Sequence, residues 1–471
     1  MKLEITNSIL RKIGAVADER SIEAYVVGGY VRDKILGKEV NDIDIVVVGN
    51  GIEFAEAAAV SLKKRKMVTY EKFGTAMLPT EDGKIEFVGA RKESYNRESR
   101  NPAVEIGTLT EDLSRRDFTI NAMAISINAD TWGEVKDPFD GEKDLGERII
   151  RTPLEPLTTF DDDPLRIMRA IRFSAQLGFS IEEKTLAAIP QMNQRLTIIS
   201  QERITDEFMK IMKSPKPSAG IRLMFDTGVL QIIFPEVAEL AGVDQRQDHH
   251  HKDVFLHTCQ VVDNISAMTD NVYLRMAALL HDIAKPKTKK FVEEIGWTFH
   301  GHEEIGARMV KHIFRRLKLP FEHVPYVEKI VRLHQRPMQL VDENVTDSAV
   351  RRILFEAGEE IDDLMTLCRA DITSKNPKLV KQYSENYDLV YSKMKEVEEK
   401  DKLRAFQPPV RGDEIMKVCN LSAGKLVGVL KARIEEAILD GRIPNEHDPA
   451  LNYLLEIKDE VIKQYVMEET D

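Results

Sequence analysis

The sequence predicts an α+β protein in which a small mixed head precedes a longer, all-helical remainder. The head is indicated by β-branched runs that alternate with helical and turn signals up to about residue 130, namely Tyr25–Val27, Ile43–Val48, Ile85–Val88 and Met123–Ile127. From about Thr158 onward such runs nearly vanish. Four-residue steps, which place apolar side chains on one helical face, take over in series such as Ile305, Met309, Ile313 and Leu317.

The composition is typical of a soluble globular protein with several domains. The chain has 471 residues, of which 42% are hydrophobic and 31% charged, so it has ample material for packed cores. No window approaches the roughly 18 consecutive apolar residues of a membrane span. Three widely spaced cysteines form neither a disulfide framework nor a zinc cluster. A formal net charge of −12 argues against indiscriminate coating of nucleic acid. We therefore expect a cytoplasmic protein that does not contact a membrane.

Proline-containing and polar stretches divide the chain into four expected parts. These stretches are Arg151–Pro156, Asp244–Asp253 and Ser374–Pro377. We expect a head over 1–155, a helical neck over 156–243, a helical body over 244–375 and a helical tail over 376–471.

Two glycines in the head indicate a place where backbone can approach a phosphate. Gly28 and Gly29 follow the strand pattern Tyr25–Val27 and precede the helical pattern Val31–Leu36. Backbone N–H groups at such a helix start can bind phosphate oxygens. Taken alone, a glycine pair between strand and helix is more often a simple turn.

Three carboxylates in the head predict a site for a divalent cation. Asp42 and Asp44 are two residues apart in a strand pattern, so their side chains point to the same face. Carboxylates this close repel each other unless a cation lies between them, and hard oxygen ligands suit Mg²⁺. Glu86 alternates with Ile85 and Phe87, so it can join the pair if those two are buried. The alternative for all three is a solvated strand face.

The head motifs together resemble those of the class II tRNA nucleotidyltransferases, which comprise the CCA-adding enzymes and their poly(A) polymerase relatives. The resemblance rests first on Gly28–Asp33, on the Asp42/Asp44 pair and on Arg115–Ala122. It extends over roughly the first 240 residues through three further motifs, Asp137–Gly141, Asp162–Phe173 and Glu202–Glu207. The resemblance implies a head related to the DNA polymerase β fold.

This resemblance also implies roles for individual residues. Asp42 and Asp44 would bind two Mg²⁺ ions and activate the 3′ hydroxyl of an RNA end. The strand alternation adds Glu86 as the third catalytic carboxylate. Triphosphate binding would fall to Gly28, Gly29 and Arg32, and the ribose would be held by Arg116, Asp117 and Asn121. The incoming base would be read by Asp163 and Arg166, whose spacing places both on one helical face. The polar stretch between Ala90 and Leu113 is similar to the flexible loop of enzymes that also add the final A.

A second cluster of ligand-type residues lies in the body. Ten of the eleven histidines fall between His249 and His334. A histidine, an adjacent His-Asp pair and a distant aspartate resemble the ligand set of the HD phosphohydrolase superfamily; here they are His257, His281, Asp282 and Asp371. His302 and His334 stand where binuclear members carry extra histidines, although a histidine on an apolar helix face, as His334 is, can also be an ordinary core residue. Such a set suits a divalent transition metal or Mg²⁺.

The leading functional hypothesis is template-independent addition of C, C and A to tRNA 3′ ends from CTP and ATP. The HD domain would process phosphate groups on RNA ends, and the tail resembles the tRNA-binding tail of class II enzymes. The alternatives within the class are a poly(A) polymerase and an A-adding or CC-adding enzyme. The alternative from a different class of enzyme is a metal-dependent phosphohydrolase whose head is vestigial. No obligate protein partner is evident.

Overall fold

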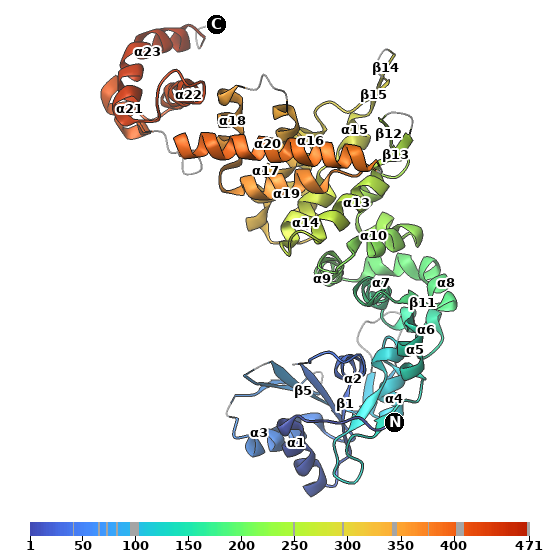
Figure 1. Cartoon of the computed structure of the whole chain (residues 1–471). Helices are drawn as coiled ribbons and strands as arrows, with labels where there is room; N and C mark the ends of the chain where they lie inside the picture. The colour runs from blue at the N-terminus through green and yellow to red at the C-terminus, as the bar shows by residue number, and fades with distance from the viewer. Residues whose placement is uncertain are drawn as a thin grey trace. The chain divides into compact units, whose positions relative to one another are not determined.

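The computed structural model describes two compact units, Met1–Pro235 and Glu236–Asp471, each with its own core (Figure 1). The residues described are 1–40, 42–64, 66–71, 74–81, 83–94, 103–247, 250–293, 296–341, 346–374, 376–401 and 409–468. The expected loop between Ala90 and Leu113 falls partly outside them, since residues 95–102 are not described. Among the described residues, no helix combines the length and the apolar character that a membrane crossing requires.

The first unit begins with a seven-stranded sheet in the order β3-β4-β5-β2-β1-β8-β9. Its strands are β1 (Ala24–Val27), β2 (Ile43–Val47), β3 (Val68–Tyr70), β4 (Thr75–Pro79), β5 (Lys84–Gly89), β8 (Ala124–Ser126) and β9 (Val135–Lys136). Strands β2 and β5 are parallel, whereas the other pairs are antiparallel. A separate hairpin consists of β6 (Arg91–Ser94) and β7 (Ala103–Ile106).

The two faces of this sheet have different partners. Helices α1 (Ser8–Glu19) and α3 (Gly51–Ser61) cover one face (Figure 1). On that face the ring of Phe87 packs against Phe54, with 5.9 Å between centroids, and Ile85 is buried. Glu86 therefore faces the opposite side, as the alternation predicted. The remaining head elements are α2 (Gly29–Ile35), α4 (Leu109–Ser114), the 3-10 turn η2 (Thr119–Asn121) and α5 (Gly141–Glu147).

The neck is a set of helices packed around α7. Its helices are α6 (Pro156–Asp162), α7 (Leu165–Leu177), α8 (Glu183–Met192), α9 (Gln201–Met212), α10 (Pro217–Asp226) and α11 (Val229–Ile233). Most of α7 is buried, and α10 can approach closely because Gly220 has no side chain: a Cβ there would lie 2.6 Å from Ile211 and 3.3 Å from Ala175. The parallel pair β10 (Ile149–Ile150) and β11 (Ser180–Ile181) joins the end of the head to the neck.

The second unit consists mainly of helices. Its body contains α13 (Val254–Ser266), α14 (Val272–Leu280), α15 (Lys285–Thr288), α16 (His302–Arg316), α17 (Val324–Leu333), α18 (Asp347–Ala357) and α19 (Ile361–Ala370). The first helix of the expected tail, α20 (Pro377–Asp401), packs against α18 and α19 of the body. The tail has its own buried cluster between α21 (Gly412–Cys419), α22 (Lys425–Leu439) and α23 (His447–Glu468), in which Leu430, Ile434 and Leu454 are buried.

The expectation of an entirely helical remainder is wrong at the short strand β11 in the neck and at two short hairpins in the body. One pairs β12 (Asp244–Gln247) with β13 (His250–Asp253), and the other pairs β14 (Lys290–Val292) with β15 (Gly296–Thr298). Strands of two to four residues are too short for a period-two pattern to be recognised against the helical background. Cross-strand side-chain contacts stabilise such hairpins, as the aromatic pair of Phe291 and Trp297 does in the second one.

Candidate functional site

Strand pairing brings two of the predicted carboxylates side by side in the head. Asp44 on β2 pairs in register with Glu86 on the parallel strand β5, so both side chains lie on the face opposite Phe87. Val27, the last residue of β1, pairs with Asp44 from the other side. Asp42 precedes β2 and is exposed. The three predicted carboxylates therefore gather at the end of the central strands, next to the turn that follows β1.

Gly28 occupies this turn with a backbone conformation that favours glycine. Its φ is +69°, and a Cβ at this position would lie 3.0 Å from Nη1 of Arg116 and 3.8 Å from Oδ2 of Asp44. Buried Asp112 holds Arg116 through a 3.1 Å ion pair. The Nε atom of Arg116 is buried and finds no hydrogen-bond acceptor among the described residues. The glycine turn thus leaves room for a ligand between a carboxylate and a guanidinium.

The charges around Asp44 fit a cation. Desolvation raises the pKa of the Asp44 carboxyl; Arg116 opposes this effect, and the negative charges of Glu86 and Asp42 reinforce it. Lys84, which the sequence reasoning missed, contacts Glu86 with 2.5 Å between Nζ and Oε1. A bound divalent cation would relieve the repulsion among these carboxylates, so the donor set suits Mg²⁺.

A hydrogen-bonded chain connects the predicted triphosphate and ribose residues. Arg32 donates from Nη1 to Oδ1 of Asn121 over 2.8 Å, and Nδ2 of Asn121 donates to Oδ1 of Asp117 over 3.0 Å. The other oxygen of Asp117 accepts from Nε of Arg169 on α7 over 2.7 Å. Although burial alone would raise the pKa of Asp117, Arg169 and Asn121 hold it below its usual range. This series of hydrogen bonds therefore connects the head with the neck.

Arg169 and Phe173 are contributors that the sequence reasoning did not single out. The guanidinium of Arg32 lies 5.1 Å from the Phe173 ring centroid, and that of Arg169 lies 5.5 Å from it. Phe118 of the head meets the same ring edge-on, with 5.8 Å between centroids. The three-residue repeat of arginines in α7, at Arg166, Arg169 and Arg172, is the sequence signal that could have identified this face.

The prediction that Asp163 and Arg166 share one helical face is wrong. Asp163 lies in the link between α6 and α7 with an extended backbone, φ −141° and ψ 99°. Pro164 is the physical reason, because proline disfavours helical geometry in the residue before it. The Asp163 carboxylate accepts from the Leu165 N–H over 3.1 Å and lies 3.4 Å from Nη2 of Arg203. Arg166 is buried and donates to the carbonyl oxygens of Thr159 and Arg115.

The second unit brings the six predicted ligand residues of the body into one cluster. One group comprises His257, His281 and Asp371, and the other comprises Asp282, His302 and His334. Within each group the ligand atoms lie within 4.8 Å of one another. Asp282 links the groups, because its Oδ2 lies 3.2 Å from Nε2 of His281 and its Oδ1 lies 3.3 Å from Nε2 of His302.

Hydrogen bonds behind the histidines orient the imidazole rings. Nδ1 of three rings contacts a backbone carbonyl three residues earlier: His281 contacts Ala278, His302 contacts Phe299 and His334 contacts Val331, over 2.6–2.7 Å. Nδ1 of His257 contacts the hydroxyl of Thr373 over 3.0 Å. Each Nε2 is thereby directed into the cluster, as in metal sites whose outer partners fix the ring tautomer.

The electrostatics of the cluster fit a metal as well. Nε2 of His334 is buried and has no hydrogen-bond partner among the described residues. Burial and the neighbouring His281 lower the pKa of His334 to about 3, so the ring is a neutral donor at physiological pH. For His281, burial is outweighed by Asp282 and Asp371, which raise its pKa to about 9. Four imidazoles and two carboxylates form a donor set of the kind that binds first-row divalent metals.

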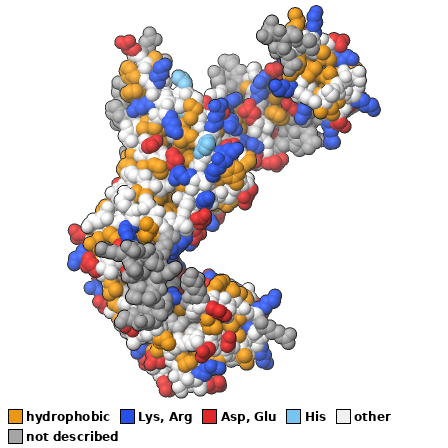
Figure 2. All heavy atoms as spheres, turned by 180° about the vertical axis from the view of Figure 1, so that it is seen from behind, with side chains coloured by type: hydrophobic (Ala, Val, Ile, Leu, Met, Phe, Trp, Pro, Cys, Tyr) orange, Lys and Arg blue, Asp and Glu red, His pale blue; other side chains and the backbone are white. Residues whose placement is uncertain are grey.

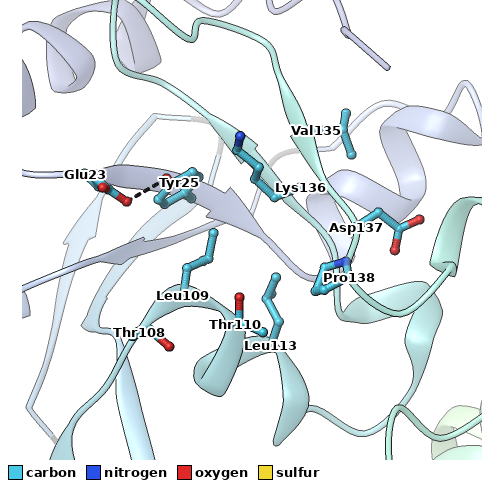
Figure 3. Close-up of a pocket in the computed structure, with 10 residues that line it drawn as sticks. All are labelled: Glu23, Tyr25, Thr108, Leu109, Thr110, Leu113, Val135, Lys136, Asp137 and Pro138. Carbon is cyan, nitrogen blue, oxygen red and sulfur yellow. Dashed lines mark hydrogen bonds between the residues drawn. The ribbon is translucent and has the colours of Figure 1, made fainter.

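A cavity of about 530 Å³ lies elsewhere in the head (Figure 3). Its lining includes Glu23, Tyr25, Leu113 and Asp137, but none of the predicted site residues. The Tyr25 hydroxyl donates to Glu23 over 2.8 Å, as the dashed line in Figure 3 marks, and Asp137 accepts from the backbone at the start of α5. These polar groups already serve the fold, so the cavity is separate from the carboxylate site.

Comparison with known families covers the head, the neck and the body. Residues 24–151 match the model described as the poly A polymerase head domain, and residues 178–240 match the probable RNA- and SrmB-binding site of polymerase A. Residues 254–375 match the HD domain. The fold and these matches define a nucleotidyltransferase of the poly(A) polymerase type joined to an HD domain.

Individual relatives make the assignment more specific. The chain is 33% identical over 362 residues to the multifunctional CCA protein of Neisseria gonorrhoeae. The aligned region spans 74% of this chain and 83% of that protein. The chain therefore belongs to the multifunctional CCA protein family, the CCA tRNA nucleotidyltransferases with an HD domain. An A-adding tRNA nucleotidyltransferase of Geobacter sulfurreducens is 39% identical over 235 residues, 49% of this chain and 26% of that protein. The solved complex of a CCA-adding enzyme with ATP has a TM-score of 0.64 at 25% identity and covers 96% of this chain and 95% of its own. The family predicted from the motifs is confirmed.

Proposed function

We propose that this chain adds C, C and A in turn to the 3′ end of tRNA, with CTP and ATP as substrates, at the carboxylates of the head. The observation that carries the proposal is the register of β2 and β5, which sets Asp44 beside Glu86 and next to the glycine turn at Gly28. Membership of the multifunctional CCA protein family supports the tRNA substrate.

The roles proposed for the head residues come from the family resemblance and are supported by their positions. Asp42, Asp44 and Glu86 would hold Mg²⁺, which supplies charge stabilisation of the attacking and departing oxygens when bound. Gly28, Gly29 and Arg32 would hold the triphosphate. Arg116, Asp117 and Asn121 would hold the ribose: Asn121 and Asp117 are linked to Arg32 by hydrogen bonds, and Nε of Arg116 has no acceptor among the described residues.

Asp163 would select the base without a nucleic-acid template, and Arg166 would support it from the neck. The Asp163 side chain is 30% exposed and can accept hydrogen bonds from a base edge. Arg166 is held by two carbonyl oxygens, so we assign it a positioning role at the junction of α4, α6 and α7. Arg203, opposite Asp163, is a further donor on this surface.

Asp163→Ala should relax the choice of nucleotide. We expect discrimination between CTP and UTP to fall roughly tenfold, because a good hydrogen-bonded base contact is worth about 1–3 kcal/mol. Competition between the two nucleotides on tRNA that lacks its CCA end measures this ratio. Asp161→Ala, at a neighbouring carboxylate that pairs with Arg195, is the matched control. Unchanged discrimination in Asp163→Ala would remove the residue from base selection.

Single-nucleotide assays test the proposed function directly. The purified chain, supplied with Mg²⁺ and tRNA lacking its CCA end, should add C residues from CTP alone and the full CCA from CTP with ATP. Addition of A alone, and only to tRNA that already ends in CC, would make it an A-adding enzyme. A long A tail would make it a poly(A) polymerase.

We further propose that the HD domain is a metal-dependent phosphohydrolase that acts on phosphate groups at RNA ends. The favouring observation is the position of Asp282 between the two ligand groups. A divalent transition metal or Mg²⁺ held there would lower the pKa of a bound water. On a 2′,3′-cyclic phosphate, water adds to phosphorus and the P–O3′ bond breaks, which frees the 3′ hydroxyl that the head needs. We place both activities in the cytoplasm, where the three free cysteines stay reduced.

A further inference from the structure

The β14–β15 hairpin carries two exposed aromatic rings that the proposed function does not use. Phe291 and Trp297 are directly opposite each other across the two strands, with ring centroids 5.1 Å apart. Their residues are 55% and 40% exposed. Large apolar side chains that remain this open, on a projecting two-stranded ribbon, form a surface on which another flat ring can stack.

One basic side chain lies beside these rings, and two more are close in sequence. Nζ of Lys289 lies 4.4 Å from the centroid of the Trp297 ring, and Lys287 and Lys290 are exposed. Figure 2 shows hydrophobic and basic side chains together on this hairpin, at the upper left. From Lys285 to Phe299 the sequence has two acidic residues, Glu293 and Glu294, against four lysines, and the structure describes Glu293 in the turn. Aromatic rings with adjacent lysines match the chemistry of unpaired nucleotides, whose bases stack and whose phosphates are anionic.

Both ends of the hairpin are joined to the metal-ligand cluster. On one side, Nζ of Lys285 contacts Oδ2 of Asp282 over 2.7 Å. On the other side, the Phe299 carbonyl contacts Nδ1 of His302 over 2.7 Å, and Lys285 lies 5.6 Å from the Phe299 ring. Trp297 precedes His302 by five residues, so their Cα atoms are at most about 18 Å apart. A few nucleotides of single-stranded RNA are therefore long enough to reach from the rings to the cluster.

We propose that the β14–β15 hairpin binds the unpaired 3′ end of RNA and presents its terminal phosphate to the HD cluster. A base stacks on Phe291 and Trp297, and Lys287 and Lys289 bind the adjoining phosphates. The inference rests on the proposed phosphohydrolase activity and adds its recognition element. RNA is favoured over a protein partner because the charge is basic and the hairpin is anchored next to ligands suited to phosphate-ester chemistry.

Tryptophan fluorescence tests binding without relying on hydrolysis. The chain has two tryptophans, so Trp132→Phe leaves Trp297 as the only one. Titration of this full-length variant with a short unpaired oligoribonucleotide should quench the emission, and added salt should weaken the effect. Constant emission over the titration would overturn the proposal. So would concentration-dependent self-association of the protein that Trp297→Ala abolishes, since the rings would then serve an interface between copies.

Hydrolysis of two substrates separates this inference from the proposed function. The double variant Phe291→Ala/Trp297→Ala should lose roughly tenfold or more in kcat/KM on RNA ending in a 2′,3′-cyclic phosphate. Its activity on bis(p-nitrophenyl) phosphate, which is too small to span the hairpin and the cluster, should stay unchanged. The control is Phe321→Ala, at an exposed aromatic beside Arg315 away from the hairpin. If the wild type hydrolyses neither substrate, the proposed activity fails; if it hydrolyses both and the double variant matches it on RNA, only the hairpin inference fails.

Discussion

Asp44→Asn should reduce nucleotide addition by about a thousandfold or more, because a metal-holding carboxylate supplies several kcal/mol of transition-state stabilisation. Asp44 is the carboxylate best placed for this role, since its register pairs it with Glu86 and its oxygen lies near Gly28 and Arg116. The measurement is the initial rate of CMP incorporation into tRNA that lacks its CCA end. Hydrolysis by the HD domain should be unaffected.

Controls distinguish this loss from unfolding. Asp130→Asn changes an exposed head aspartate outside the carboxylate group and should keep full activity. The pKa of Asp44 is raised in the folded chain, so its ionisation, as pH rises above about 4, costs stability. Without divalent cations at pH 7, Asp44→Asn should therefore melt no lower than the wild type, and added Mg²⁺ should stabilise it less. Equal activity of variant and wild type would move the catalytic centre elsewhere.

Asp282→Asn should remove bound metal from the HD domain and lower phosphodiester hydrolysis by about a thousandfold or more. Asp282 lies between His281 and His302 and also holds Lys285, so no other carboxylate in the cluster can replace it. The measurements are metal content after dialysis and the hydrolysis of bis(p-nitrophenyl) phosphate. CCA addition should continue at the wild-type rate.

His312→Gln is the matched control, because His312 is exposed on α16, the helix that begins at His302. It should retain both metal and hydrolysis. A chelator should abolish hydrolysis in the wild type, and Mn²⁺ or Ni²⁺ should restore it, whereas excess Mg²⁺ should suffice for nucleotide addition. Full metal content in Asp282→Asn would show that the two ligand groups do not depend on their common carboxylate.

Much of both sites could be predicted because their patterns are local. The two-residue period of a strand set Glu86 opposite to Phe87, and the ligand types of the body identified the histidines and aspartates of the cluster. Asp163 was misplaced because a helical repeat was extended across Pro164. Lys84 was missed because its role depends on its reach toward Glu86. Arg169 was missed because its contact with Asp117 spans 52 residues of sequence: the arginine repeat of α7 marks the face but does not identify the partner.

The carbonyl contacts behind the histidines bear on how the metal cluster forms. His281, His302 and His334 are each oriented by a carbonyl three residues earlier, so the chain sets these rings as soon as the local turn exists. His257 differs, because its outer partner is Thr373, 116 residues away. Three of the four histidines are thus oriented within their own segments, whereas the orientation of His257 depends on a long-range contact. The segment after α19 supplies both Asp371 and Thr373, so one carboxylate ligand and the outer partner of His257 come from the same short stretch of chain.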